Sequence, residues 1–290
     1  MPERNSSRIK NDCRTIKAKW GMLFLFFALV GACELKTSST QETVETTEKK
    51  DIIPNIAFSV VGYYPHDTKS FTEGFVWHGE KLFESTGSPQ DMPELRSVIG
   101  EMNLKTGKLD VKAELDRKTY FGEGMVFLKD KVYQLTYQNQ MGFLYDAQSF
   151  RSLGSFRFTN AEGWGLTTDS IHLIMSDGTS NLTYLDPENF TVRKTISVTE
   201  NDQLVSRLNE LEFINGYIYA NIWTTHSVVK IDPVSGKVIG KFDFSSLDAE
   251  VRAKYPQALE MNGLAYNPKS NHLFVTGKLW PTVYEIEAKF

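Results

Sequence analysis

Short runs of apolar, β-branched and aromatic residues recur along most of the chain, and turn-forming or charged residues bound each run. Residues 56–64 predict a first strand that ends at Pro65. Further on, residues 125–128 and 132–136 are separated only by Lys129-Asp130-Lys131, and this spacing predicts a β-hairpin. Residues 246–255 are the one stretch with helical character, and we expect a helix in a loop there. The pattern therefore predicts an all-β fold.

A group of three or four such runs repeats five times. Each copy opens on Gly or Glu followed by an apolar residue, and its third run ends in a turn that contains Asp or Asn. The openings are 41 to 51 positions apart, at Gly74, Gly124, Gly165, Glu212 and Gly263. Repeats of this length without long helices are typical of β-propellers. We predict a five-bladed β-propeller over residues 52–290, closed by pairing of the strand before Pro65 with residues 283–286 in the last blade. A β-sandwich or two smaller β domains are the alternatives.

The N-terminal residues have a different composition. Six basic residues precede an apolar run at 20–32, which is typical of a secretion signal and too short for a stable transmembrane helix. The run ends in Leu29-Val30-Gly31-Ala32-Cys33, which resembles the lipobox of bacterial lipoproteins. The resemblance implies cleavage of the signal peptide 1–32 and lipidation of Cys33. Residues 33–51, rich in Thr, Ser, Glu and Lys, predict a disordered tether. An ordinary secreted protein with an incidental Cys33 is the alternative.

The same segment predicts the location of the protein. Glu34 stands where Asp is associated with retention in the inner membrane, so we expect the outer membrane or periplasm of a bacterial cell envelope. Removal of residues 1–32 changes the formal net charge from -4 to -8 and leaves Cys33 as the only cysteine, so we expect no disulfide. The charge gives no indication of nucleic-acid binding. We expect a monomer that touches the membrane only through its lipid anchor.

Acidic or amide residues stand beside apolar ones in the loops that lead into the innermost strand of each predicted blade. In a propeller these positions face the central channel. They are Phe71-Thr72-Glu73, Phe121-Gly122-Glu123, Glu162-Gly163-Trp164, residues 209–212 and Glu260-Met261-Asn262, and other strand ends add Gln134, Tyr137, Asn221, Trp223 and Lys278. Carboxylates crowded in an apolar mouth have raised pKa values, as acid catalysis at neutral pH requires. The structural alternative is that some of them, above all Glu212 and Glu260, tie blades together through loop backbone.

Glu123 has the most open setting of these carboxylates. Glycines flank it on both sides, so the backbone can turn sharply there and another group can approach closely. Metal chemistry has little support, because the five histidines are scattered with no pair at ligand spacing. We expect no cofactor, and structural calcium bound by acidic loop groups is an open alternative.

Several motifs between Val60 and the C-terminus resemble, in order and spacing, those of the plant-type (type I) glutaminyl-peptide cyclotransferases. They include Tyr64-Pro65-His66-Asp67, Phe71-Thr72-Glu73-Gly74, Glu84-Ser85-Thr86-Gly87, Phe121-Gly122-Glu123-Gly124, Gly163-Trp164-Gly165-Leu166 and Thr276-Gly277-Lys278-Leu279. The resemblance implies a five-bladed propeller that converts the N-terminal Gln of peptides or proteins to pyroglutamate and releases ammonia.

The resemblance also implies roles for single residues. Glu123 matches the acid–base carboxylate, Trp164 and Trp223 match pocket walls, and Asn209 and Lys278 fall on polar positions that we hypothesise to steady an oxyanion. We assign the remaining candidates to substrate binding: Phe71, Glu73, Phe121, Gln134, Tyr137 and Asn221. Two of these depart from the family pattern, since Glu73 replaces a usual Gln and Tyr137 a usual Trp. Both departures put substrate preference, working pH and activity itself in question.

Two other classes of function remain open at this point. One is a metal-dependent propeller hydrolase of the lactonase kind, which needs calcium at the channel. The other is a non-catalytic propeller that binds peptides at the cell surface.

Overall fold

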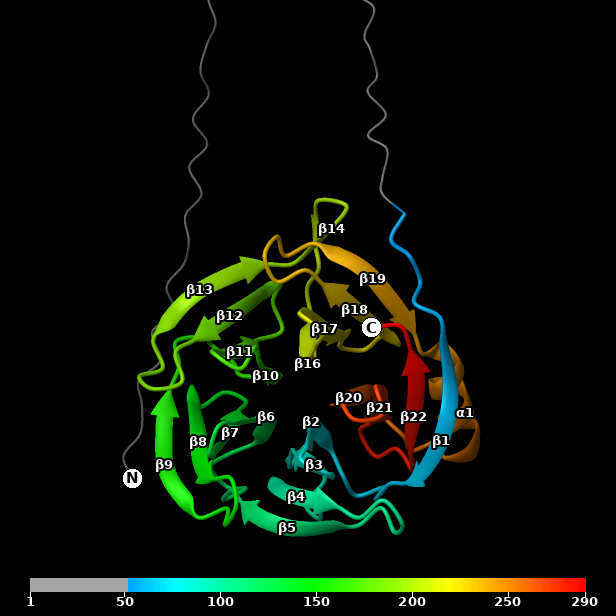
Figure 1. Cartoon of the computed structure of the whole chain (residues 1–290). Coiled ribbons are helices and arrows are strands. Elements are labelled where there is room, and N and C mark those ends of the chain that lie inside the picture. Colours follow the sequence, from blue (N-terminus) through cyan, green and yellow to red (C-terminus); the bar gives the residue numbers. More distant parts are fainter. Residues whose placement is uncertain (1–51) are drawn as a thin grey trace, which may run out of the picture. The chain divides into compact units, whose positions relative to one another are not determined.

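The computed structural model describes residues 52–290, so the predicted signal peptide, the tether and Cys33 lie outside the described residues. The described strands form five four-stranded antiparallel sheets arranged in a ring (Figure 1). The prediction of a five-bladed propeller is therefore confirmed, and the two other β architectures are excluded. We number the sheets as blades one to five in chain order.

Each blade runs from an innermost to an outermost strand. The first blade contains β2 (Thr72–His78), β3 (Lys81–Thr86), β4 (Val98–Met102) and β5 (Leu109–Glu114). The second contains β6 (Gly122–Leu128), β7 (Lys131–Thr136), β8 (Met141–Asp146) and β9 (Ser152–Arg157). The third contains β10 (Leu166–Thr168), β11 (Leu173–Ser176), β12 (Asn181–Leu185) and β13 (Val192–Ser197). The fourth contains β16 (Leu208–Ile214), β17 (Tyr217–Ile222), β18 (Ser227–Ile231) and β19 (Val238–Asp243).

The fifth blade joins the two ends of the described chain. It contains β20 (Met261–Asn267), β21 (His272–Gly277) and β22 (Thr282–Ala288), with β1 (Phe58–Pro65) as its outermost strand. In the antiparallel register of β1 and β22, Tyr63 pairs with Tyr284 and Tyr64 with Val283. The predicted closure of the ring is therefore confirmed. A short hairpin of β14 (Thr199–Glu200) and β15 (Gln203–Leu204) between the third and fourth blades was not anticipated.

Burial follows the position of a strand within its blade. Every residue of the inner strand β6 is buried, whereas the outer strand β9 has one buried residue of six. Apolar side chains fill the space between neighbouring blades, as where Val76 and Phe83 of the first blade pack with Met125 and Phe127 of the second. The described residues contain five such clusters, one at each junction between blades. Removal of this apolar surface from water is the main stabilising contribution to the ring.

The inner strands approach one another closely where glycines occur. The N–H of Gly124 donates to the carbonyl of Trp164 over 2.8 Å. A Cβ atom on Gly124 would lie only 2.5 Å from the backbone nitrogen of Leu166, so no other residue fits there. The glycine after Glu123 therefore brings the second and third blades together at the mouth of the channel.

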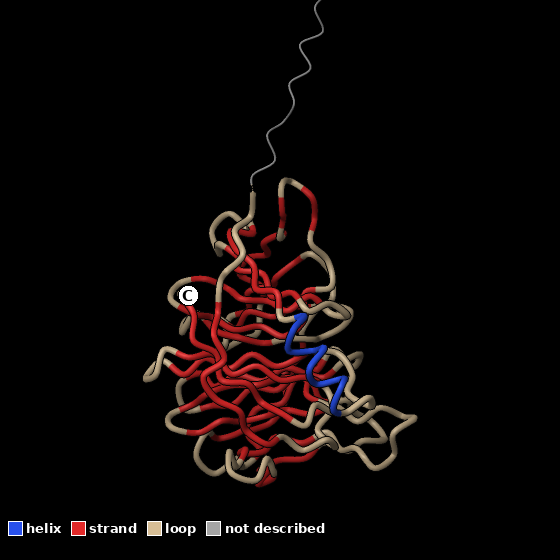
Figure 2. The backbone as a smooth tube through the Cα atoms, turned by 90° about the vertical axis from the view of Figure 1, so that its right-hand side faces the viewer, coloured by secondary structure: helices blue, strands red, loops and turns tan. Residues whose placement is uncertain are grey.

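The predicted helix is present as α1 (Ser245–Lys254) on the outside of the ring, visible from the side in Figure 2. Leu247 and Val251 on one side of α1 pack into the cluster between the fourth and fifth blades. Asp248, also buried, pairs with Arg252 one turn later at 2.8 Å. Across residues 52–290, no helix has the length and apolar character needed to cross a membrane.

Candidate active site

Four of the five inner strands contain a β-bulge at the same end, and each bulge contains a polar residue of the predicted mouth. The strand register shifts between Thr72 and Gly74, Gly122 and Met125, Leu208 and Leu211, and Met261 and Leu264. The residues inside these shifts include Glu73, Glu123, Asn209 and Asn262. A β-bulge leaves one residue out of the regular strand pairing and changes the direction of its side chain. Bulges are therefore frequent beside active sites.

A cavity of about 570 Å³ opens at this end of the ring. Its wall combines charged, amide and aromatic side chains from several blades: Phe71, Glu73, Phe121, Glu123, Tyr137, Trp164, Asn209, Trp223 and Lys278. These are nine of the eleven residues to which the sequence assigned catalysis or substrate binding. A volume of this order is typical of small-molecule binding sites.

A continuous network of hydrogen bonds joins polar side chains of the first, fourth and fifth blades at the cavity. Lys278 Nζ donates to Glu73 Oε1 over 2.8 Å, and the Lys278 side chain is only 8% exposed. Asn262 Nδ2 donates to Glu73 Oε2 over 3.0 Å, and Asn209 Nδ2 donates to Asn262 Oδ1 over 3.1 Å. Both oxygens of Glu73 are therefore bound by donors, one of them a cation, and this arrangement favours the ionised form of Glu73.

Glu123 has a different environment in the same cavity. Within the described part of the chain, no donor binds its carboxyl group. Burial, and next the nearby charge of Glu73, raise the pKa of Glu123 well above the usual value of a glutamate. Burial also raises the pKa of Glu73 to about 7, but there the ammonium of Lys278 opposes the effect. Because only Glu73 is hydrogen-bonded to a cation, burial favours the protonated form of Glu123 with less opposition than it meets at Glu73.

Aromatic rings form the sides of the cavity. Trp164 and Trp223 meet edge to face with centroids 5.5 Å apart, and Trp164 Nε1 donates to Glu162 Oε2 over 2.9 Å. Phe121 contacts Phe71 edge to face, with ring centroids 6.0 Å apart. The Lys278 ammonium lies 4.5 Å from the centre of the Phe71 ring. These contacts fix the rings in place, so the cavity keeps its shape without a ligand.

Gln134 and Asn221 lie behind the cavity wall, and this corrects their assignment to substrate binding. Gln134 Nε2 donates to Ser85 Oγ over 2.9 Å. Asn221 Oδ1 accepts from the backbone N–H of Glu210 over 2.9 Å. Both side chains point between strands and use their amide groups on neighbouring blades or on the bulged backbone. They therefore support the site from behind.

Two acidic side chains of the fourth blade tie blades together through backbone groups, which was the structural alternative to a role in the cavity. Glu212 Oε1 accepts from the N–H of Tyr266 over 2.8 Å. Glu210 Oε1 accepts from the N–H of Phe75 and its Oε2 from the N–H of Leu264, each over 3.0 Å. Glu210 therefore joins the first, fourth and fifth blades. Glu260, the other residue assigned to this role, contributes its backbone carbonyl to the N–H of Lys278 over 2.9 Å.

Sequence reasoning missed several residues of the site. Asn262 and Glu162 belong to motifs that were recognised, but their contacts with Glu73 and Trp164 depend on the arrangement of blades. The outer lip of the cavity comes from loops of the first and second blades: Ser88, Pro89, Gln90, Arg117, Lys118, Thr119, Tyr120, Gln138 and Asn139. These loops lie outside the repeated positions, so the repeat gave no signal for them.

Residues 52–290 contain no group of three or more His, Cys, Asp or Glu side chains placed to hold a metal ion. The fold and the cavity define a β-propeller enzyme in which a carboxyl group with a raised pKa and an ammonium–carboxylate pair face an aromatic pocket. Such a site suits acid–base chemistry on a small polar group.

Comparisons with known proteins identify the family. The family model described as glutamine cyclotransferase matches residues 29–288. A glutaminyl-peptide cyclotransferase of Arabidopsis thaliana is 33% identical over 271 residues, which cover 93% of this chain and 80% of the relative. The crystal structure of Myxococcus xanthus glutaminyl cyclase superposes with a TM-score of 0.75 at 33% identity, over 82% of this chain and 99% of the other.

The chain belongs to the glutamine cyclotransferase family. The predicted activity, conversion of N-terminal Gln to pyroglutamate, is the activity of this family, and the prediction of an enzyme is confirmed. The metal-dependent hydrolase and the non-catalytic binding propeller are therefore set aside.

Proposed function

We propose that this enzyme cyclises N-terminal glutaminyl residues by acid–base catalysis through Glu123, with Glu73, Lys278 and Asn209 as its polar partners. The observation that supports the proposal best is the contrast between two carboxyl groups of one cavity. Glu73 binds Lys278 at 2.8 Å, whereas Glu123 has a raised pKa and no donor among the described residues. Glu73 is thus the carboxyl group whose ionisation a cation supports, and Glu123 is the one available as an acid.

The reaction requires one bond to form and one to break. The α-amine nitrogen of the substrate attacks the carbon of its own side-chain carboxamide, and the bond from that carbon to the amide nitrogen breaks. The leaving nitrogen takes a proton from Glu123 and departs as ammonia. The attacking nitrogen loses a proton, which returns to the Glu123 carboxylate, so the enzyme ends as it began. Proton transfer by a placed carboxyl group contributes about 10²–10⁴-fold.

The aromatic walls perform a second task, which is to fold the substrate. A free Gln side chain samples many rotamers, and few of them bring the amine close to the amide carbon. A pocket walled by Trp164, Trp223 and Phe121 admits the compact shape and excludes extended ones. The amine itself has a pKa of about 7.7–8.0 when free, so a sufficient fraction is neutral near pH 7.

Lys278 and Asn209 are the donors for the negative charge that develops on the carboxamide oxygen. Lys278 uses one of its three N–H groups on Glu73, and Asn209 uses one of its two amide N–H groups on Asn262. Both side chains line the cavity and retain further N–H groups for an oxyanion. A Lys278→Ala or Asn209→Ala enzyme with unchanged turnover would remove that residue from the mechanism.

The proposed reaction is tested with the full chain and two short peptides. One begins with free Gln, and the other carries the same sequence with an acetylated N-terminus. Ammonia and a cyclised product are expected only from the first, because the acetylated nitrogen is not nucleophilic. Release of ammonia from both peptides would indicate a general amidase, and release from neither would overturn the proposal.

We also propose that catalysis needs no metal or other cofactor. The donors that the mechanism uses are side chains of the described residues, with Lys278 supplying the positive charge. Prolonged treatment with a strong chelator is expected to leave both turnover and thermal stability unchanged. Loss of stability alone would indicate a structural calcium ion, and loss of turnover at unchanged stability would contradict the proposal.

The N-terminal sequence supports a proposal on location. Cys33 ends a lipobox-like sequence and is followed by Glu34, so the enzyme is lipid-anchored in the bacterial cell envelope, on the outer membrane rather than the inner one. A radiolabelled fatty acid is expected to label the wild-type chain and not a Cys33→Ser chain. Equal recovery of both chains in the membrane fraction would contradict lipid anchoring.

A further inference from the structure

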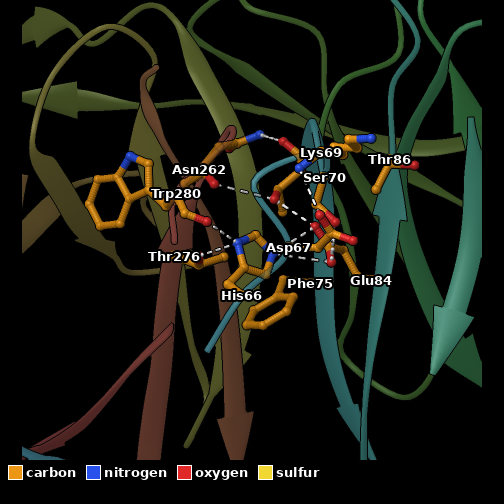
Figure 3. Close-up of polar contacts among 12 residues, drawn as sticks. His66, Asp67, Lys69, Ser70, Phe75, Glu84, Thr86, Asn262, Thr276 and Trp280 are labelled. Atoms are coloured by element: carbon orange, nitrogen blue, oxygen red, sulfur yellow. Dashed lines mark hydrogen bonds and ion pairs between the residues drawn. The ribbon is translucent and has the colours of Figure 1, made fainter. Parts of the chain in front are cut away.

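A second buried polar cluster lies where the first and fifth blades meet (Figure 3). At its centre, Glu84 of β3 faces His66, which follows β1, and the side chains of both residues are fully buried. The His66 Nε2 atom lies 3.2 Å from each oxygen of the Glu84 carboxylate. The two residues belong to sequence motifs that the mechanism leaves without a role.

The hydrogen bonds of His66 define its charge. Its Nδ1 atom lies 2.7 Å from the carbonyl oxygen of Trp280, which can only accept, so Nδ1 carries a proton. Its Nε2 atom faces two carboxylate oxygens and carries the other proton. Burial lowers the pKa of His66, but the Glu84 charge and the bond to Trp280 outweigh burial, and the pKa is raised overall. His66 and Glu84 therefore form a buried ion pair.

Two hydroxyl groups connect this ion pair to the segment that leads into Glu73. Thr72 Oγ1 donates to Glu84 Oε1 over 2.6 Å, and Ser70 Oγ donates to Glu84 Oε2 over 3.1 Å. Thr72 is the residue immediately before Glu73. Glu84 thus holds the bulged start of β2 from behind while Glu73 points forward into the cavity.

The same cluster holds the segment that carries Lys278. Leu279 has a left-handed backbone with φ of 59°, which is unfavourable for a residue with a branched side chain and turns the chain just after Lys278. The N–H of Leu279 donates to the carbonyl of Ser70 over 2.8 Å. His66 binds the next residue, Trp280, through its carbonyl. Both members of the Glu73–Lys278 pair are therefore attached to one buried group.

We propose that the His66–Glu84 pair is a positioning group of the active site, which sets the geometry of the Glu73–Lys278 ion pair through Thr72 and Ser70. The proposal rests on the function proposed above for the cavity. Glu84 and His66 do not touch the substrate in this account. They keep the Lys278 ammonium paired with the Glu73 carboxylate, so Glu123 is the carboxyl group with no cation from residues 52–290 bound to it.

Thr72→Val is the most direct test, because it removes the hydroxyl group, keeps the shape of the side chain and leaves His66 and Glu84 in place. Thr72→Ser is its matched control and restores the hydroxyl group. Tyr64→Phe is a second control, since it also removes a 2.6 Å hydroxyl-to-carboxylate bond, to Glu285, at the outer edge of the fifth blade. The full chain of each variant is assayed for kcat, KM and thermal unfolding.

We expect Thr72→Val to lower kcat about tenfold with a smaller change in KM, because small misplacements in an active site have effects of this order. Thr72→Ser is expected to recover most of the loss, and Tyr64→Phe to lower the melting temperature without lowering kcat. Ser70→Ala, which removes the other hydroxyl group from Glu84, is expected to act like Thr72→Val. Equal kinetic effects of Thr72→Val and Tyr64→Phe would overturn the proposal. The His66–Glu84 pair would then contribute to the stability of the fold and not to the geometry of the active site.

A second measurement does not depend on turnover. The titration of the Glu73 carboxyl group is followed by ¹³C NMR and assigned by the loss of its signal in Glu73→Gln. With Thr72→Val the midpoint is expected to move to higher pH. Burial raises the pKa of Glu73, and a displaced Lys278 ammonium counteracts that rise less strongly. An unchanged midpoint would overturn the positioning role. If the wild type released no ammonia, the proposed function would fail while this titration still decided the positioning role.

Discussion

The Nζ atom of Lys278 lies 2.8 Å from Oε1 of Glu73, and this ion pair joins the fifth blade to the first inside the cavity. Glu123, in the same cavity, has no such partner in residues 52–290. The two glutamates therefore have different environments. In acid–base sites, such a difference moves the two pKa values apart and gives the two carboxyl groups different roles.

The rate of ammonia release is expected to have a bell-shaped dependence on pH. The rate rises as the substrate amine loses its proton around pH 7.7–8.0. It falls again when Glu123 loses the proton that it must donate. Because burial raises the pKa of Glu123 well above the usual value of a glutamate, this loss occurs at a higher pH than in an exposed glutamate. Values of kcat/KM between about pH 5 and about pH 10 test this, and a rate that stays constant above the amine pKa would contradict the acid role.

Glu73→Gln is expected to move the alkaline side of that profile to lower pH. The substitution removes a negative charge that raises the pKa of Glu123, and it leaves the Lys278 charge, which lowers that pKa, without its partner. Both changes act in the same direction. Glu80→Gln is the matched control, because Glu80 also binds a lysine at 2.8 Å, but on the exposed surface. A profile that is the same for all three proteins would show that Glu73 does not influence the catalytic acid.

Trp223→Ala is expected to lower kcat/KM about 10²-fold. The substitution opens one side of the cavity, so the substrate loses the enforced geometry of attack, and misplacement by about 1 Å has an effect of this size. Trp223→Phe keeps part of the wall and is expected to lose less. Trp77→Ala is the control, since Trp77 stacks on Phe274 away from the cavity wall. An Ala variant as active as the Phe variant would contradict the role of the wall.

Glu212→Gln is expected to become relatively more stable than the wild type as pH rises. Burial raises the pKa of Glu212 to about 8, while an unfolded glutamate titrates near about 4.3. Between these values the folded state binds more protons than the unfolded state, so the free energy of unfolding falls as pH rises through this window. Gln keeps the oxygen that accepts from Tyr266 and has no proton to lose.

Thermal unfolding of Glu212→Gln and wild type between about pH 4 and about pH 9 tests this linkage. The difference in Tm is expected to grow with pH, since about 1 kcal/mol shifts Tm by about 2–4 °C at this size. A constant difference across the range would show that Glu212 titrates as it does in the unfolded chain.

The repeat made the fold predictable from the sequence. The apolar openings after Gly74, Gly124, Gly165, Glu212 and Gly263 fall on inner strands or their immediate starts, and the strand before Pro65 closes the ring as expected. The repeat works because each blade must bury both faces against its neighbours, which imposes the same run of apolar residues every time. The β14–β15 hairpin between the third and fourth blades has no counterpart between other blades of the described chain, so the repeat does not predict it.

The site was predictable where it coincides with the repeat and less so elsewhere. Glu73, Glu123 and Asn209 were found because they stand at the repeated positions before the inner strands, and bulges of those strands place them at one mouth. Gln134 and Asn221 occupy equivalent strand ends, but their side chains turn between strands, and the direction of a side chain is set by packing that a sequence pattern does not contain. The lip around Arg117 comes from loops whose course depends on contacts such as that of Arg117 with the carbonyl of Pro89, at 2.7 Å.

The central claim is that Glu123 is the acid–base group, and one comparison tests it most directly. Ammonia release from a peptide with N-terminal Gln is measured for the full-length wild type, Glu123→Gln and the surface control Glu80→Gln. Glu123→Gln keeps the size of the side chain and removes the exchangeable acid, so we expect kcat to fall by about 10²–10⁴-fold with little change in KM, and Glu80→Gln to match the wild type. A folded Glu123→Gln enzyme that retains wild-type turnover would contradict the mechanism.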